Sequence, residues 1–149
     1  MNKKRVNDML LTAKEALKDC EIVDRNDKID ATFRNQISSF GAAVVMGSLP
    51  AAVAFFSAKN NSSTDRQNLM KAIYYCIKVF ESPIEQKATA KKEASGKTAR
   101  DVLEYVCRNY SYELKEKVID ASIAIKLAMN FYELDPKGKE NEKSESDIQ

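Results

Sequence analysis

The segment Ile37-Ser-Ser-Phe-Gly-Ala-Ala-Val-Val-Met-Gly-Ser-Leu-Pro-Ala-Ala-Val-Ala-Phe-Phe56 decides the fold of this chain. It lies in a run, residues 35–58, that has no charged residue and is long enough to cross a bilayer. Gly47 and Pro50 interrupt the run in the middle, and neither half would span a membrane alone. Because Pro is tolerated in the first turn of a helix, a helix from Pro50 to about Lys59 should follow the break. We therefore predict a buried helical hairpin. Since residues 51–56 are apolar on every side, we also expect Phe55 to be buried.

Apolar residues at three- and four-residue steps predict further helices on both sides of the hairpin. These helices cover residues 3–20, about 28–46 and about 64–82, and two more begin at the capping residues Thr98 and Ser111. Four glycines and three prolines are too few for a many-stranded β protein. We predict an all-α fold: a single domain over residues 1–134, a compact bundle of about six helices with the hairpin at its centre.

Two segments have no apolar face to bury. Residues 84–97 contain one large apolar side chain, Ile84, and four lysines, so we expect a mobile basic linker. Residues 135–149 contain three lysines, five acidic residues and one large apolar side chain, Ile148. We expect this second segment to be a disordered polar tail.

The composition argues against an enzyme. The chain has no histidine, which removes the common catalytic triads and the commonest transition-metal ligand. No glycine-rich phosphate-binding motif is present, and the three cysteines, Cys20, Cys76 and Cys107, have no metal-binding spacing. We therefore expect no catalytic residue, no metal and no cofactor. Reduced cysteines, and a start too polar for a signal peptide, predict a cytoplasmic protein without a membrane span.

Basic residues on predicted helix faces are the feature that points to a function, namely contact with nucleic acid. Lys71, Tyr75 and Lys78 fall at i, i+4 and i+7 and would share one exposed helix face. Lysines neutralise phosphates, and a tyrosine between them can stack on a base or a sugar. An ordinary solvated face with a tyrosine at the core boundary has the same pattern.

A further lysine, Lys126, is the only charge between Asp120 and Glu133. Either its stem extends from the edge of the core or its charge is held against a partner. Three more basic residues border the hairpin and the loop that follows it. The full set of candidate RNA-binding residues is Arg34, Lys59, Arg66, Lys71, Tyr75, Lys78 and Lys126.

Three segments together resemble a known family. They are the hairpin 37–56, Met70-Lys-Ala-Ile73, and Asp120-Ala-Ser-Ile-Ala-Ile-Lys-Leu-Ala-Met-Asn-Phe-Tyr-Glu-Leu134. In order and spacing they resemble the small all-helical fifth subunit of the Cmr complex, the type III-B CRISPR effector of bacteria and archaea. The family break usually reads small residue, Gly, Leu, whereas Gly47 here precedes Ser48 and Leu49. The resemblance covers most of residues 1–134, and the tail has no counterpart.

The resemblance implies a non-catalytic structural subunit. Copies of it would stack along the guide RNA–target RNA duplex and pack on the repeated backbone subunit, which would carry out target cleavage. Basic residues such as Lys71, Lys78 and Lys126 would contact the RNA backbone, and such contacts carry no sequence information. The alternative is a helical protein–protein adaptor that does not bind nucleic acid.

Overall fold

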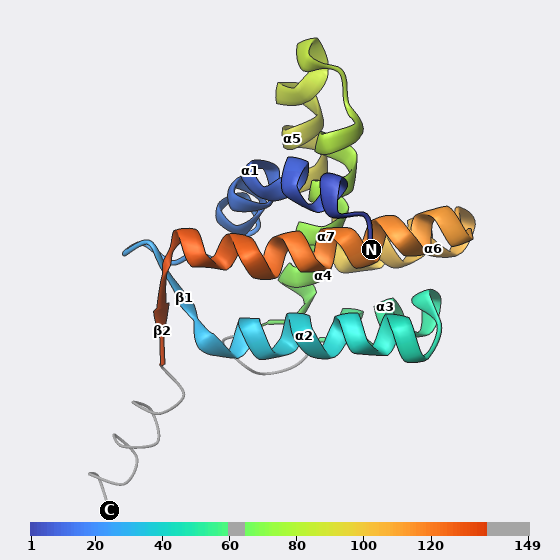
Figure 1. Ribbon diagram of the computed structural model, residues 1–149, viewed down its shortest axis with the longest axis horizontal. Coiled ribbons are helices and arrows are strands. Elements are labelled where there is room, and N and C mark those ends of the chain that lie inside the picture. Colours follow the sequence, from blue (N-terminus) through green and yellow to red (C-terminus); the bar gives the residue numbers. More distant parts are fainter. Residues whose placement is uncertain (60–64, 137–149) are drawn as a thin grey trace, which may run out of the picture.

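The computed structural model describes residues 1–59 and 65–136 (Figure 1). Within them the prediction of an all-α bundle is confirmed. The seven α-helices are α1 (Lys3–Asp19), α2 (Ala31–Met46), α3 (Leu49–Ser57), α4 (Gln67–Glu81), α5 (Lys87–Ser95), α6 (Ala99–Arg108) and α7 (Tyr112–Ala128). Short 3-10 turns, η1 (Ile84–Gln86) and η2 (Met129–Phe131), precede α5 and follow α7.

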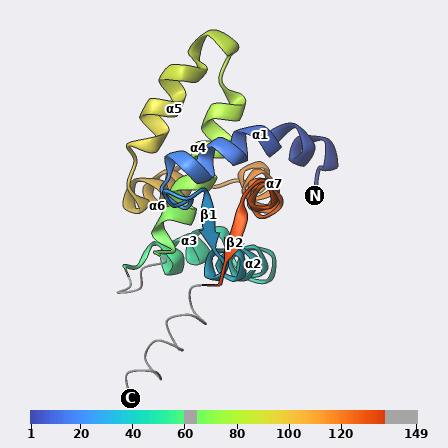
Figure 2. The same cartoon turned by 90° about the vertical axis from the view of Figure 1, so that its left-hand side faces the viewer.

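Helix α7 is the middle of the bundle. It packs against α1 on one side and α2 on the other, and α4 crosses behind it and also contacts α1 (Figures 1 and 2). Its buried side chains, Ala121 and Ile125 among them, join one core with Leu17 of α1, Phe40 of α2 and Met70 of α4. Each of these five residues is at most 1% exposed. The core therefore draws on helices from both ends of the sequence.

The hairpin break forms where the sequence places it. The Gly47 N–H donates to the Ala43 carbonyl, and a Cβ at Gly47 would lie only 3.0 Å from that oxygen. Ser48 then caps α3 by accepting from the Ala51 N–H at 3.2 Å. The expected caps at Thr98 and Ser111 also form, with Asp101 completing a capping box at Thr98. None of the described helices is long and apolar enough to cross a membrane.

The hairpin is buried on one side only. Phe56 is 5% exposed and packs edge-on against Phe40, whereas its neighbour Phe55 is 63% exposed. Helix α3 lies at the edge of the bundle, so its outer face meets solvent although the residues on it are apolar. The prediction that Phe55 is buried is therefore wrong.

The segment expected to be a mobile linker is helix α5. Its alanines suit a helix, and Ala94 is buried where α5 packs on α4. Lys87 fixes the start of α5, because its Nζ donates to the Val79 carbonyl at the end of α4 at 2.9 Å. Ala90 also packs against the core, so α5 is docked although it has almost no apolar stripe.

Two three-residue strands were not expected. β1 (Lys28–Asp30) pairs in parallel with β2 (Glu133–Asp135), and Ile29 of β1 is fully buried. Strands this short leave no periodic signal in a sequence. The described domain thus runs through Asp135, one residue beyond the expected boundary, and the expected tail over 137–149 lies outside the described residues.

Candidate nucleic-acid interface

The face of α4 that carries Lys71, Tyr75 and Lys78 is largely covered. α1 packs on one side of α4 and α6 on another. Tyr75 is fully buried, and its hydroxyl donates to Asp19 Oδ2 of α1 at 2.5 Å. Burial and this hydrogen bond raise the pKa of the phenol. Tyr75 has no free ring face for a base, so the prediction that it contacts RNA is wrong.

The two lysines of α4 are half-buried and lie in different surroundings. Lys78 Nζ lies 4.2 Å from the ring centre of Tyr105 and 5.9 Å from that of Tyr74, over two rings that meet edge to face. Part of its charge is therefore already engaged by aromatic faces of its own chain. Burial raises the pKa of the Cys20 thiol to about 12, and the nearby charge of Lys71 offsets part of that rise. That RNA contacts these two lysines stays a prediction.

Arg34 and Lys126 come together along the seam between α2 and α7. Arg34 donates to Asn130 Oδ1 at 3.1 Å, and Asn130 follows Lys126 by one helical turn. Lys126 lines a shallow groove of about 230 Å³ whose other residues, such as Ile37 and Ile123, are mostly apolar. Within the described residues Lys126 makes no hydrogen bond or ion pair. Two cations from distant parts of the chain thus share one seam.

Arg66 and Lys59 lie at the outer end of the hairpin. The Arg66 guanidinium is 4.5 Å from the ring centre of Phe55 and 5.7 Å from that of Phe56. Its Nε is buried without a hydrogen-bond partner in the described part of the chain. Lys59 is exposed at the end of α3, next to residues 60–64, which are not described. The seven sequence candidates therefore fall into at least three separate places.

The lysines of α5 are partly engaged by their own chain. Lys91 Nζ forms an ion pair with Glu15 of α1 at 2.6 Å, and Lys87 holds the end of α4 as described above. Lys92 and Lys97 are exposed. Of the four lysines in residues 84–97, only these two are therefore exposed to solvent.

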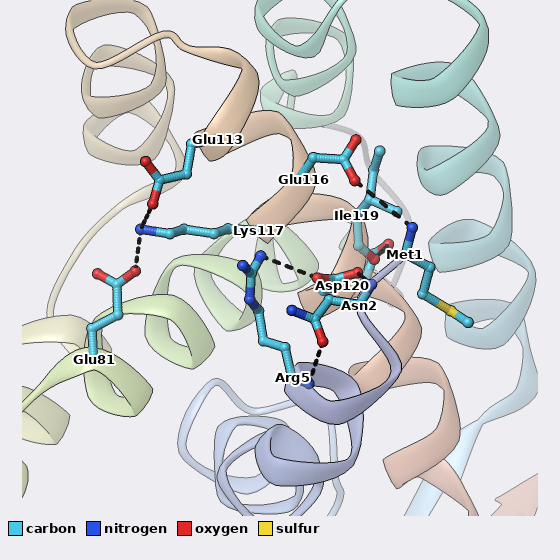
Figure 3. Close-up of polar contacts among 10 residues, drawn as sticks. Met1, Asn2, Arg5, Glu81, Glu113, Glu116, Lys117, Ile119 and Asp120 are labelled. Atoms are coloured by element: carbon cyan, nitrogen blue, oxygen red, sulfur yellow. Dashed lines mark hydrogen bonds and ion pairs between the residues drawn. The ribbon is translucent and has the colours of Figure 1, made fainter.

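A buried polar network was missed by the sequence reasoning (Figure 3). Asp120 of α7 is fully buried, and its two carboxylate oxygens accept from the Asn2 backbone N–H and from Arg5 Nη1, each at 3.1 Å. Nearby, Lys117 bridges Glu81 of α4 and Glu113 of its own helix at 2.7 and 3.3 Å. The signal for the first cluster was a single Asp within α7, directly before the apolar half of that helix. Its distant partner, however, cannot be read from spacing.

The described residues offer little chemistry beyond binding. No group of three or more histidine, cysteine or acidic side chains among them could hold a metal ion. Burial raises the pKa values of the Cys20 and Cys76 thiols, so neither is a ready nucleophile. Cys107 is exposed.

Comparison with known proteins adds no relative. No family model matches the chain, and neither a curated protein nor a solved structure shows significant similarity to it. The resemblance to the fifth Cmr subunit therefore rests on the sequence motifs alone.

Proposed function

We propose that this protein is a non-catalytic structural subunit of an RNA-guided RNA-silencing ribonucleoprotein of the Cmr type. In this proposal it lies in the cytoplasm, packs on the backbone subunits and on neighbouring copies of itself, and follows the guide RNA–target RNA duplex. Target cleavage belongs to the backbone subunit, as the resemblance implies. The protein itself needs no cofactor.

The observation that carries the proposal is the α2–α7 seam. Both helices belong to segments that resemble the family, and they pack closely: a Cβ at Gly41 of α2 would lie 3.6 Å from Ser122 Oγ of α7. Lys126 lines this seam and has no ion-pair partner among the described residues, and Arg34 binds Asn130, one turn beyond Lys126. A cation without a counter-ion at a helix seam suits a phosphate of a nucleic-acid backbone. The seam therefore takes the place of the α4 face as the leading RNA contact.

A second function is favoured by the exposed apolar side chains of the hairpin. Val45, Met46 and Phe55 are 59%, 87% and 63% exposed, and all three lie on α2 or α3. Exposed large apolar side chains can mark a protein–protein contact. They support the helical adaptor that does not bind RNA.

A purification from the native host distinguishes the two functions. The tagged protein should bring down large CRISPR subunits together with guide RNA, which sequencing of the bound RNA would identify. Recovery of protein partners without RNA supports the adaptor and contradicts the ribonucleoprotein.

Variants in the reconstituted complex test the seam itself. Replacing both Arg34 and Lys126 by Ala should weaken target-RNA binding uniformly across sequences. It should also lower the slope of log affinity against log salt concentration by up to about two units, because each phosphate that loses its protein contact keeps its counter-ion. The matched control replaces Lys92 of α5 and Lys97, which follows α5, by Ala and so removes the same charge from another part of the surface. If the first variant incorporates and binds as the wild type does, the seam does not contact RNA. If it fails to incorporate, the two residues are contacts to a protein subunit.

A further inference from the structure

A second concave site lies on the side of the molecule where α1 approaches the turn before β1. The cavity has a volume of about 450 Å³ and is lined by α1, by Asp27 of that turn, and by Phe131 and Tyr132 after α7. This volume falls in the range of small-molecule sites, roughly 300–1,000 Å³. None of the seven candidate RNA-binding residues lines it.

The apolar part of the cavity consists of two exposed side chains. Phe131 is 50% exposed and Leu11 of α1 is 67% exposed. Single apolar residues on a surface are ordinary, but these two share one hollow. Tyr132 holds the segment in place, because its hydroxyl donates to the Lys14 carbonyl of α1 at 2.9 Å. The ring of Phe131 is thus presented to solvent next to a fixed wall.

The charged part contains two cations and an available carboxylate. Lys14 and Lys18 lie one turn apart on α1, and neither forms an ion pair in the described part of the chain. Lys14 Nζ lies 5.1 Å from the ring centre of Phe131. Glu15 also lines the cavity, but its charge is neutralised by an ion pair with Lys91, whose Nζ lies 2.6 Å from Glu15 Oε2. The remaining charges give the cavity a net charge of +1.

Asp27 supplies the carboxylate. It adopts a left-handed backbone, with φ of 58°, in a turn whose amides are held by Asp24. Asp27 lines the cavity. Burial raises the pKa of the Tyr132 phenol in the same cavity, and the charges of Asp27, Asp19 and Glu15 raise it further. No hydrogen bond or ion pair to the side chain of Asp27 is found within the described residues.

We propose that this cavity binds a guanine nucleotide, either free or as an unpaired residue of an RNA strand. The base displaces the Lys14 ammonium from the face of Phe131 and stacks there, and Lys14 and Lys18 bind the phosphate. Asp27 accepts hydrogen bonds from the adjacent N–H donors on the Watson–Crick edge of guanine. Unpaired bases are commonly read by an aromatic ring and by contacts to this edge. Adenine, cytosine and uracil do not offer two adjacent N–H donors to one carboxylate, so guanine is preferred.

The test uses the full-length isolated chain, so it does not depend on the proposed assembly. 5′-GMP, 5′-AMP and 5′-UMP are titrated by calorimetry at low salt, together with two RNA oligonucleotides: oligo-U and the same oligomer with one central G. GMP should bind more tightly than AMP or UMP. Binding of the G-containing oligomer that is tighter than both GMP and oligo-U would identify an RNA residue as the ligand, whereas GMP binding with no difference between the two oligomers would identify a free nucleotide.

Two variants and a control decide the outcome. Phe131→Ala should weaken GMP binding roughly 5- to 100-fold, because the stacking platform is lost. Asp27→Asn, a change on an exposed turn, should remove the preference for GMP over AMP. Phe55→Ala removes an exposed aromatic that lies outside the cavity and should leave binding unchanged. Each variant is checked for its folded state by circular dichroism. If neither GMP nor the G-containing oligomer binds, or if Asp27→Asn keeps the preference for GMP, the proposal is overturned.

Discussion

Replacing Arg5 by Met should lower the free energy of unfolding by about 3 kcal/mol, because it leaves a charge stranded in the core. Asp120 is fully buried in α7, and Arg5 is its only cationic partner among the described residues. Removing one partner of a buried pair typically costs about 3–5 kcal/mol. The lower end applies here, since the Arg5 side chain is 24% exposed and the Asn2 N–H still donates to the carboxylate.

Urea unfolding at neutral pH, followed by circular dichroism, measures this loss. The matched control is Arg108→Met, which breaks an ion pair with Glu104 whose side chains are 75% and 61% exposed. Its cost should stay below about 0.5 kcal/mol. Combining Arg5→Met with Asp120→Leu should recover about half of the loss, because the stranded charge is then gone. A cost for Arg5→Met no larger than that of the control would refute the reasoning, since Asp120 would then reach water.

Three further outcomes follow from burial. Phe56→Ala should destabilise the protein by about 3–4 kcal/mol in urea unfolding, whereas Phe55→Ala should cost less than about 1 kcal/mol. Equal losses would contradict the assignment of the outer face of α3. A thiol reagent should modify Cys107 alone in the native protein, and Cys20 and Cys76 only after unfolding, as counted by mass spectrometry. Burial raises the pKa of Cys20 from its ordinary 9.0 to about 12 and also raises that of Cys76. A raised pKa means that the folded state holds the proton more tightly, so the free energy of unfolding should fall as pH rises above about 9. A flat profile from pH 8 to 10.5 would argue against this.

The sequence predicted the helices and their ends better than it predicted which of their side chains are buried. Caps and breaks are local, so Thr98, Ser111 and the Gly47–Ser48 break could be placed by residue type alone. Burial depends on what covers a face, and this depends on helices far away in the chain. Phe55 and Phe56 are chemically identical neighbours, yet Phe56 is buried and Phe55 is exposed, because only one side of α3 faces the rest of the bundle. Residues 84–97 were expected to be a mobile linker or a loose helix end because they lack an apolar stripe, whereas in the structure α5 is held by Ala94, by the Lys87 contact to Val79 and by the ion pair of Lys91 with Glu15.

The same distinction explains why the candidate RNA face moved. A spacing of i, i+4 and i+7 places three side chains on one side of α4, but it does not say whether that side is open. Here α1 covers Tyr75, and the rings beside Lys78 engage its ammonium group. Lys126, by contrast, was notable only as a single charge in an apolar helix, and among the described residues it has no ion-pair partner at the seam that it lines. A charge that the chain's own residues do not neutralise is a better guide to a polyanion contact than a regular basic pattern, because neutralised lysines release few counter-ions. The Arg34 and Lys126 variant is therefore the sharpest single test of whether this bundle touches RNA.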